Sequence, residues 1–435
     1  MKSQNSVVII GAGLAGCEAA YTLAKAGTRV KLYDMKPGKK SPAHSEDNLA
    51  ELVCSNSLGA ERLSSAPGLL KAEMRMLGSL LLDCADKTKV AAGGALAVDR
   101  ERFSKAVTDA VKNHPLIALR EEEVKSIPEG WAIIATGPLT SDDFAQEIAN
   151  LCGGEYLSFY DAAAPIVMAN SLDYDKVFRA SRYGRGGDDY INCPFDRQEY
   201  ESFYREIIAA RPAQLSEFDQ SPKVYEGCMP VEVMAKRGED TLRYGPLKPV
   251  GLNDPKTGRR PWAVAQLRAE NAQGTMYNLV GFQTNLAFQE QKRVFSMIPG
   301  LENAEFARFG VMHRNTFLDS PRLLSADFSL KKKPQLFFAG QITGTEGYME
   351  SAAGGIIAAH QLMRKMREQE PIIFPPETML GAFSRYISDE SVKDFQPMGA
   401  NMGLLPPLGE KIRDKQERYL RIAERSLELM EATIR

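Results

Sequence analysis

Three glycines near the start of the chain have the spacing of a dinucleotide-binding turn. Gly11, Gly13 and Gly16 lie in the run Gly-Ala-Gly-Leu-Ala-Gly. In such a run the first glycine permits a tight turn, the second lets backbone N–H groups reach a pyrophosphate, and the third lets the following helix lie close to the strand. Asp34 comes about 20 residues later, where its carboxylate can accept hydrogen bonds from an adenosine ribose. These residues predict a dinucleotide site, which also includes Ala12, Leu14 and Ala15.

Two cysteines could supply nucleophilic or acid–base chemistry. Cys54 lies in the stretch Ala-Glu-Leu-Val-Cys-Ser-Asn-Ser, and Cys228 lies between a glycine and Met-Pro. Lys236 and Arg237 follow Cys228 closely, and cations near a thiol favour its reactive thiolate form. Most cysteines of a protein with reduced thiols are buried and inert. The pattern alone therefore leaves both residues open between a reactive and a structural role.

The elements around the glycine run distinguish it from an ordinary glycine-rich turn. The pattern predicts a short buried strand over 6–10, an Ala-rich helix over 17–26 and a second strand over 28–33 that ends at Asp34. This order of strand, turn, helix and strand is the context in which the run binds a dinucleotide. We therefore expect a Rossmann-like unit here.

Two later turns favour FAD over NAD. A plain nicotinamide enzyme places its catalytic residues soon after the first fold, whereas a flavoprotein commonly closes around FAD with an Ala-Thr-Gly turn and a late strand–glycine turn. Both turns follow apolar strand-like runs, Trp-Ala-Ile-Ile-Ala and Gln-Leu-Phe-Phe-Ala. The residues expected to contact FAD are Thr136, Gly137, Gly340 and Gln341, with Gly354 and Gly355, which are predicted to open the next helix.

The widely separated strands predict a parallel sheet assembled from both ends of the chain. From Phe159 to Phe309 the chain loses the Ala-rich helical pattern and carries aromatic and turn residues. The expected fold class is α/β: an FAD-binding Rossmann-like domain of the glutathione-reductase-like kind over 1–158 and 310–435, with an inserted α+β domain over 159–309. A charged amphipathic helix is predicted over 410–435.

The composition limits the class of protein. The 435 residues are 44% hydrophobic and 25% charged, which indicates a folded globular protein. The 54 Lys+Arg and 56 Asp+Glu give a net charge of −2, which predicts no basic nucleic-acid binder.

No apolar stretch approaches the roughly 18 residues of a membrane span, so we expect a cytoplasmic protein with reduced thiols. No cysteines have zinc spacing, so no metal site is expected, and His44 and His313 are expected to be surface or core residues.

Beyond these patterns, the chain resembles the folate- and FAD-dependent tRNA (uracil-5-)-methyltransferases of bacteria, the TrmFO family. The resemblance covers nearly the whole chain. It includes the glycine run, the two cysteine stretches and the segments 93–100, 135–140, 160–165, 281–286, 312–317, 340–348 and 404–408. The glycine run and the Gly-Gln-Ile turn are shared with GidA-like proteins, which modify the tRNA wobble uridine. The cysteine stretches and the short C-terminus favour the methyltransferases.

The resemblance implies a reaction. Methylenetetrahydrofolate supplies a methyl group, which passes through reduced FAD to the 5-position of the T-loop uridine of tRNA, giving ribothymidine, with NADPH or NADH as reductant. Uracil is a poor carbon nucleophile until a thiolate adds at its 6-position, and a base must later remove the proton at the 5-position. Cys54 and Cys228 match the catalytic positions of the family, and we expect both near the flavin. Which one is the nucleophile and which the base stays open.

A tRNA substrate needs a cationic surface despite the balanced total charge. From Lys223 to Arg293 the chain has eleven Lys+Arg and seven Asp+Glu, a surplus of 11 − 7 = +4. Candidate phosphate contacts there are Lys236, Arg237, Arg259 and Arg260, although a solvated face of mixed charge has a similar composition. The target uridine is expected to flip out of the folded tRNA.

Two alternative functions stay open. One is another flavoenzyme, such as a GidA-like wobble-uridine modifier, and the other is a non-catalytic RNA-binding protein that contains FAD.

Overall fold

A parallel sheet built from separated stretches of the chain forms the centre of the larger lobe. The computed structural model describes residues 6–434 except 155, 214–228 and 394. The sheet has the order β16–β17–β7–β1–β2–β6, and all its strands are parallel except β16 at the edge. Its strands are β1 (Ser6–Ile10), β2 (Arg29–Asp34), β6 (Ile117–Glu121), β7 (Ala132–Ile134), β16 (Ser329–Leu330) and β17 (Lys333–Phe338). The predicted α/β class with a parallel sheet is confirmed.

The register of this sheet brings the carboxyl ends of three strands to one edge. Ile134 at the end of β7 pairs with Ile10 at the end of β1 and with Phe338 at the end of β17. The three glycine-containing turns that follow these strands therefore lie next to one another. In open α/β sheets, ligands bind in the crevice at this edge.

Helices α1 (Leu14–Lys25) and α11 (Tyr348–Met366) pack closely against each other. A Cβ atom at Gly355 would lie 2.3 Å from the carbonyl oxygen of Ala15, so this close approach requires a glycine. Both predicted helix starts were wrong, because α1 begins at Leu14 rather than Cys17 and α11 begins at Tyr348 rather than Gly354. Burial of the surrounding apolar residues outweighs the low helix propensity of the glycines.

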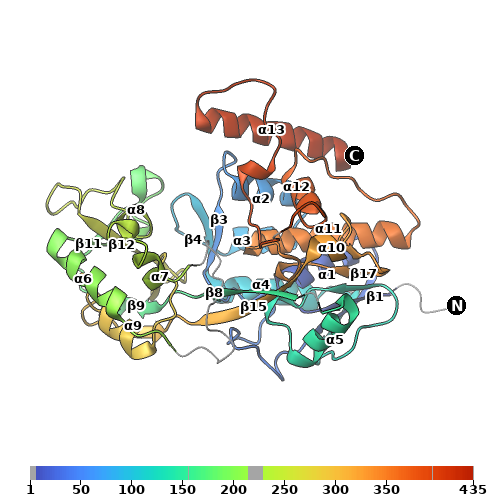
Figure 1. The fold of residues 1–435 in the computed structure, drawn as a ribbon, viewed down its shortest axis with the longest axis horizontal. Coiled ribbons are helices and arrows are strands. Elements are labelled where there is room, and N and C mark those ends of the chain that lie inside the picture. Colours follow the sequence, from blue (N-terminus) through green and yellow to red (C-terminus); the bar gives the residue numbers. More distant parts are fainter. Residues whose placement is uncertain (1–5, 155, 214–228, 394, 435) are drawn as a thin grey trace.

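The remaining elements of the larger lobe surround this pair. They are the helices α2 (Ala66–Met76), α3 (Leu80–Lys87), α4 (Arg100–Lys112), α5 (Asp142–Cys152), α10 (Ser320–Leu323), α12 (Met379–Tyr386) and α13 (Lys415–Ile434), and a small sheet of β3 (Ser57–Ala60), β5 (Ala95–Val98) and β4 (Lys89–Val90). Figure 1 shows α13 along the top of the molecule, near α2 and α12. This helix begins at Lys415, five residues later than predicted.

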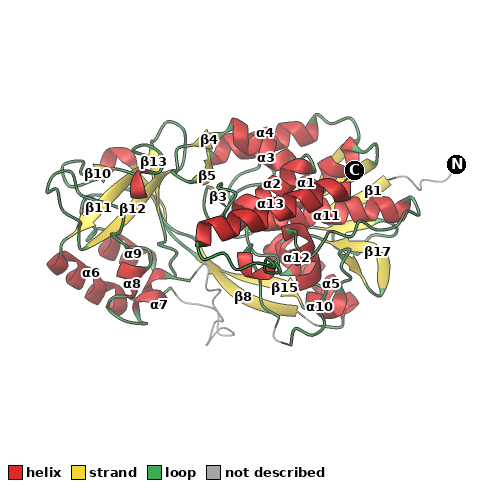
Figure 2. Ribbon diagram, turned by 90° about the horizontal axis from the view of Figure 1, so that it is seen from above, coloured by secondary structure: helices red, strands yellow, loops and turns green. Residues whose placement is uncertain are grey.

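A second lobe, the described residues between Ala163 and Gly310, has its own sheet and hydrophobic core. The sheet is antiparallel, in the order β10 (Phe178–Arg179), β11 (Tyr190–Phe195), β12 (Ala263–Ala269), β13 (Met276–Leu279), β9 (Ile166–Met168) and β14 (Phe306–Arg308). Its helices are α6 (Arg197–Ala209), α7 (Val231–Ala235), α8 (Thr241–Tyr244) and α9 (Phe288–Phe295). The lobes lie side by side in Figures 1 and 2, and the antiparallel strands β8 (Tyr156–Ala162) and β15 (Met312–Leu318) connect them. The domain boundaries at 159 and 309 stay a prediction.

One buried carboxylate ties three helices of the larger lobe together. Glu73 of α2 accepts hydrogen bonds from the backbone N–H groups of Met379 (2.7 Å) and Leu380 (2.9 Å), which begin α12. The Ser426 hydroxyl of α13 also donates to it, at 2.6 Å. Burial raises the pKa of Glu73 from 4.5 to about 7, and the three hydrogen bonds oppose this shift only in part.

The raised pKa predicts a pH-dependent contribution of Glu73 to stability. A carboxyl group whose pKa is higher in the folded state stabilises the fold below its unfolded pKa, and this contribution is lost as the pH rises through about 7. Between pH 5 and pH 8 the free energy of unfolding of the wild type should therefore fall by about 2 kcal/mol relative to that of Glu73→Gln. Urea unfolding across this range measures the difference. Parallel pH profiles for the two proteins would contradict the prediction, and the exposed Glu129→Gln serves as control.

Candidate active site

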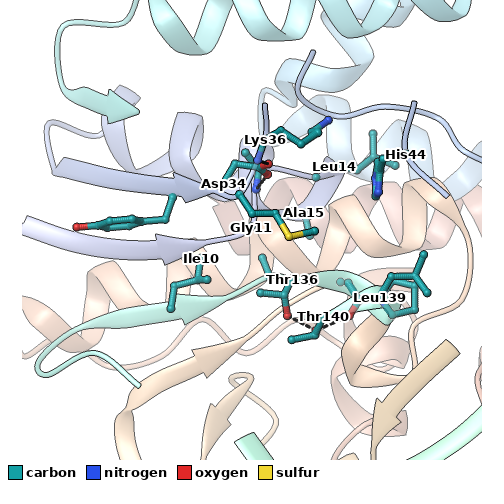
Figure 3. Close-up of a pocket in the computed structure, with 18 of the residues that line it drawn as sticks. Ile10, Gly11, Leu14, Ala15, Asp34, Lys36, His44, Thr136, Leu139 and Thr140 are labelled. Atoms are coloured by element: carbon teal, nitrogen blue, oxygen red, sulfur yellow. Dashed lines mark hydrogen bonds between the residues drawn. The ribbon is translucent and has the colours of Figure 1, made fainter. Parts of the chain in front are cut away.

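The turns after β1, β7 and β17 surround a pocket at the edge of the parallel sheet. It has about 1160 Å³ of empty volume and opens to solvent. Figure 3 shows Gly11 and Ala15 between Asp34 and Lys36 on one side and Thr136 on the other. Ten of the predicted cofactor residues line this pocket: Gly11, Ala12, Gly13, Leu14, Ala15, Asp34, Thr136, Gly137, Gly340 and Gln341. The structure therefore brings together turns that are up to 330 residues apart in the sequence.

Positions 11 and 13 are occupied by glycine for different physical reasons. Gly11 has a φ of +94°, and a Cβ atom there would lie 2.5 Å from the carbonyl oxygen of Ala135. Gly13 has a φ of −72°, and, its own helix and chain neighbours apart, no protein atom lies within 4 Å of the place where its Cβ would be. Gly13 is the N-cap of α1, where backbone N–H groups and the helix dipole attract a pyrophosphate. The fold therefore requires Gly11, whereas Gly13 leaves space for a ligand.

Asp34 is held against the glycine turn by its own hydrogen bonds. One carboxylate oxygen accepts from the backbone N–H of Ala12 at 2.8 Å, and the other accepts from that of Lys36 at 2.9 Å. Each carboxylate oxygen has a second lone pair, so both can still accept a hydrogen bond from a ribose hydroxyl. Asp34 is therefore in place for the role that the sequence predicts.

Three predicted cofactor residues do not line the pocket. A Cβ atom at Gly16 would lie 1.8 Å from the carbonyl oxygen of Gly11, and one at Gly354 would lie 3.2 Å from the backbone nitrogen of Gly340. Gly355 lies against Ala15, as described above. These glycines let α1 and α11 pack close to the turns, and their contact with a cofactor stays a prediction.

Sequence reasoning missed part of the pocket wall. Five of the missed residues are polar and come from two loops without helical or strand periodicity: Lys36, His44, Glu51, Glu122 and Glu123. Lys36 donates to the carbonyl oxygen of Asn48, and its Nζ atom lies 3.9 Å from the Glu51 carboxylate. Burial lowers the pKa of His44, and the charge of Lys36 lowers it further, so this ring is neutral at pH 7. No sequence pattern marked these residues.

Cys54 lies in a smaller cavity beside the pocket, with about 360 Å³ of empty volume. Four residues line both spaces: Val53, Pro138, Leu139 and Gln341. The Cys54 Sγ atom lies 4.0 Å from the carbonyl oxygen of Ala162, which also lines the smaller cavity. One of the two predicted catalytic thiols is thus adjacent to the predicted cofactor pocket.

The Tyr348 hydroxyl connects this thiol loop to the start of α11. It accepts hydrogen bonds from the backbone N–H groups of Cys54 (2.7 Å) and Ser55 (3.1 Å). Burial raises the pKa of Tyr348, so the hydroxyl is protonated at neutral pH. Tyr348 also forms part of the pocket wall.

The other predicted site residues fall between Ala163 and Gly310 in the sequence. Cys228 lies outside the described residues. The side chains of Lys236, Arg237, Arg259 and Arg260 are exposed, which a contact with a polyanion requires. Across the described ranges, no group of three or more His, Cys, Asp or Glu residues could hold a metal ion. Within the same part of the chain, every helix is too short or too polar to cross a membrane.

Comparisons with known proteins identify the family of this chain. Residues 6–370 match the family model described as glucose inhibited division protein A (GIDA). The chain is 56% identical to a protein of Acetivibrio thermocellus over 97% of both chains and 57% identical to one of Listeria innocua over 98% of both; each is named methylenetetrahydrofolate–tRNA-(uracil-5-)-methyltransferase TrmFO. In a crystal structure of Aquifex aeolicus GidA, 73% of that chain aligns with 98% of this one, with a TM-score of 0.69 and 17% identity. This last similarity shows the shared fold.

The open space at Gly13 predicts a variant that separates cofactor binding from folding. Gly13→Ala meets no protein atom and has an ordinary φ, so the melting temperature of the cofactor-free protein should change by no more than about 2 °C. The added methyl group occupies the place expected for a pyrophosphate, so the dissociation constant for FAD should rise about tenfold or more. Flavin fluorescence titration measures it. Gly409→Ala, also without a neighbour within 4 Å, should bind FAD normally; equal affinities for the two variants would refute this assignment.

Proposed function

The chain belongs to the methylenetetrahydrofolate–tRNA-(uracil-5-)-methyltransferases, within the larger GIDA family, and on this basis we propose how its residues carry out the reaction. It is an FAD- and folate-dependent enzyme that methylates the 5-position of a uracil in tRNA. The observation that supports our assignment of the site is the cavity of Cys54, which shares four lining residues with the dinucleotide pocket.

The residues around the larger pocket fit FAD. The start of α1 at Gly13 offers backbone N–H groups and open space for the pyrophosphate, and the carboxylate of Asp34 can accept from the ribose. When bound, FAD carries the electrons and the one-carbon unit that the reaction moves from folate to uracil. Gln341 of the Gly340–Gln341 turn lines both this pocket and the cavity of Cys54. We propose that the reactive end of the cofactor lies at this turn.

Cys54 is proposed to act directly on the uracil. A thiolate that adds to the 6-position moves an electron pair to the 5-position, which then attacks the one-carbon unit. A base must next take the proton from the 5-position, after which the thiolate leaves and the ring regains its double bond. The one-carbon unit is released from its carrier and reaches the methyl level by taking up the two electrons that the reductant supplies. Cys54 takes one of these two roles and Cys228 the other. The division between nucleophile and base stays open, since Cys228 lies outside the described residues.

The position of the target uridine in the tRNA and the source of electrons are also proposals. We infer that the target is the T-loop uridine, which must flip out of the tRNA fold to reach the cavity of Cys54. NADPH or NADH is proposed as the source of electrons. The 56–57% identity to the folate-dependent methyltransferases, over nearly the whole chain, favours this reaction over the wobble-uridine modification considered from the sequence.

Replacing the thiol tests the proposed role of Cys54. Cys54→Ala should reduce the rate of methylation of a T-loop transcript by about 10²-fold or more, because covalent or acid–base assistance is lost, while FAD binding is retained. The assay follows transfer of label from methylenetetrahydrofolate to tRNA with NADPH present. Cys84→Ala, which removes a buried thiol of α3 outside both cavities, is the control. Methylation at the wild-type rate by Cys54→Ala would exclude this residue from the chemistry.

Salt dependence tests the proposed phosphate contacts of the second lobe. Each lost phosphate contact reduces the slope of log K against log salt concentration by about 1, so the double variant Arg259→Ala/Arg260→Ala should bind tRNA with a slope shallower by about 2. Arg29→Ala/Lys31→Ala removes two exposed cations from β2 in the larger lobe and should keep the wild-type slope. Equal slopes for the two double variants would show that Arg259 and Arg260 do not contact the tRNA.

A further inference from the structure

The loop that carries Cys54 is held by arginines of both lobes. From the larger lobe, Arg100 at the start of α4 donates to the carbonyl oxygen of Leu52. From the second lobe, Arg308 of β14 donates to the carbonyl oxygen of Val53. These two carbonyl groups immediately precede Cys54, so each lobe fixes one peptide group next to the thiol.

A second arginine of the second lobe holds the other side of the loop. Arg268 of β12 donates through Nη2 to the Ser55 hydroxyl at 2.7 Å and through Nε to the Asn56 side-chain oxygen at 2.9 Å. The Asn56 amide in turn donates to the carbonyl oxygens of Val98 (2.9 Å) and Ala269 (2.8 Å), one in each lobe. Val53, Ser55 and Asn56 are therefore bonded to the second lobe, on both sides of Cys54.

Burying these arginines close together costs electrostatic free energy. Arg268 is only 6% exposed, and Arg100 is paired with the buried carboxylate of Glu270 at 2.9 Å. Burial lowers the pKa of Arg308, and the positive charge of Arg100 nearby lowers it further. Placing like charges together out of water is unfavourable unless their hydrogen bonds compensate. The carboxylate of Glu270 compensates part of this cost at Arg308, and Arg308 and Arg268 also donate hydrogen bonds to groups of the thiol loop.

We propose that Arg308 and Arg268 are positioning residues through which the second lobe sets the geometry of the Cys54 thiol. The loop keeps its conformation only while the second lobe is seated against the larger lobe. Because the exposed cations proposed to contact tRNA lie on that second lobe, the position of the lobe links substrate binding to the placement of the thiol. This inference rests on the proposed role of Cys54 in the reaction.

Replacing Arg308 by Met tests the proposal. Met preserves much of the side-chain length and removes a buried charge next to Arg100, so the variant should fold and bind FAD. Exchange of amide hydrogens in the peptide 50–57, which contains the Cys54 and Ser55 N–H groups bonded to Tyr348, should accelerate about tenfold. The kcat for methylation should fall about tenfold or more, with KM for tRNA within about twofold of the wild type, because a misplaced reacting group slows the chemical step.

Two further variants make the test specific. Arg308→Lys keeps a donor for the Val53 carbonyl and should restore slow exchange in 50–57 and most of kcat. Arg182→Met removes a guanidinium of the second lobe that donates to the carbonyl oxygens of Lys248 and Val250, within the same lobe. It should leave exchange in 50–57 and kcat at wild-type values.

The outcomes are distinct. Accelerated exchange and lowered kcat in Arg308→Met, reversed in Arg308→Lys and absent from Arg182→Met, support the positioning role. Wild-type exchange in 50–57 for Arg308→Met, or equal acceleration in Arg182→Met, would overturn it, since the arginine would then act only on the stability of the lobe. If the wild type itself methylates no tRNA, the proposed function fails, whereas the exchange measurement still decides whether the second lobe holds the loop.

Discussion

The site depends on the parallel register in which Ile134 is flanked by Ile10 and Phe338. This pairing sets the ends of β1, β7 and β17 at one level, and the three turns that follow therefore converge on one pocket. The glycines of these turns are consequences of that convergence. Gly11 is needed because the Ala135 carbonyl is so close, and Gly355 because α11 lies against Ala15. A shift of one residue in this register would separate the turns and turn buried side chains outward.

Much of this architecture could be predicted from the sequence because the signals are local. The apolar runs that end in glycine turns marked β1, β7 and β17, and the spacing of Gly11, Gly13 and Asp34 marked the pocket. The helix starts were less predictable, because Gly354 looks like a boundary in the sequence but is buried inside α11 by tertiary packing. Nothing in the sequence indicated that Lys36 and His44 line the pocket, because they lie in an irregular loop that has no hydrophobic periodicity.

The surroundings of Cys54 show a different limit of sequence reasoning. The stretch around Cys54 is a candidate site on its sequence, but nothing in that sequence indicates that Arg100, Arg268 and Arg308 donate hydrogen bonds to it. These arginines are 46 to 254 residues away in the chain. Contacts of this kind are made by whichever side chains the tertiary fold brings near. The net charge of −2 likewise gave no indication that cations gather inside the protein around one short loop.

The two strands that connect the lobes give the molecule a mechanical property. β8 and β15 pair over seven successive residues, so the chain enters and leaves the second lobe through one hydrogen-bonded ribbon. Stretching or sliding such a ribbon breaks several hydrogen bonds at once, whereas bending it across its face breaks none. The movement of the second lobe that leaves this ribbon intact is therefore a bend across its face, and the hydrogen bonds of Arg268 and Arg308 to the Cys54 loop oppose that bend.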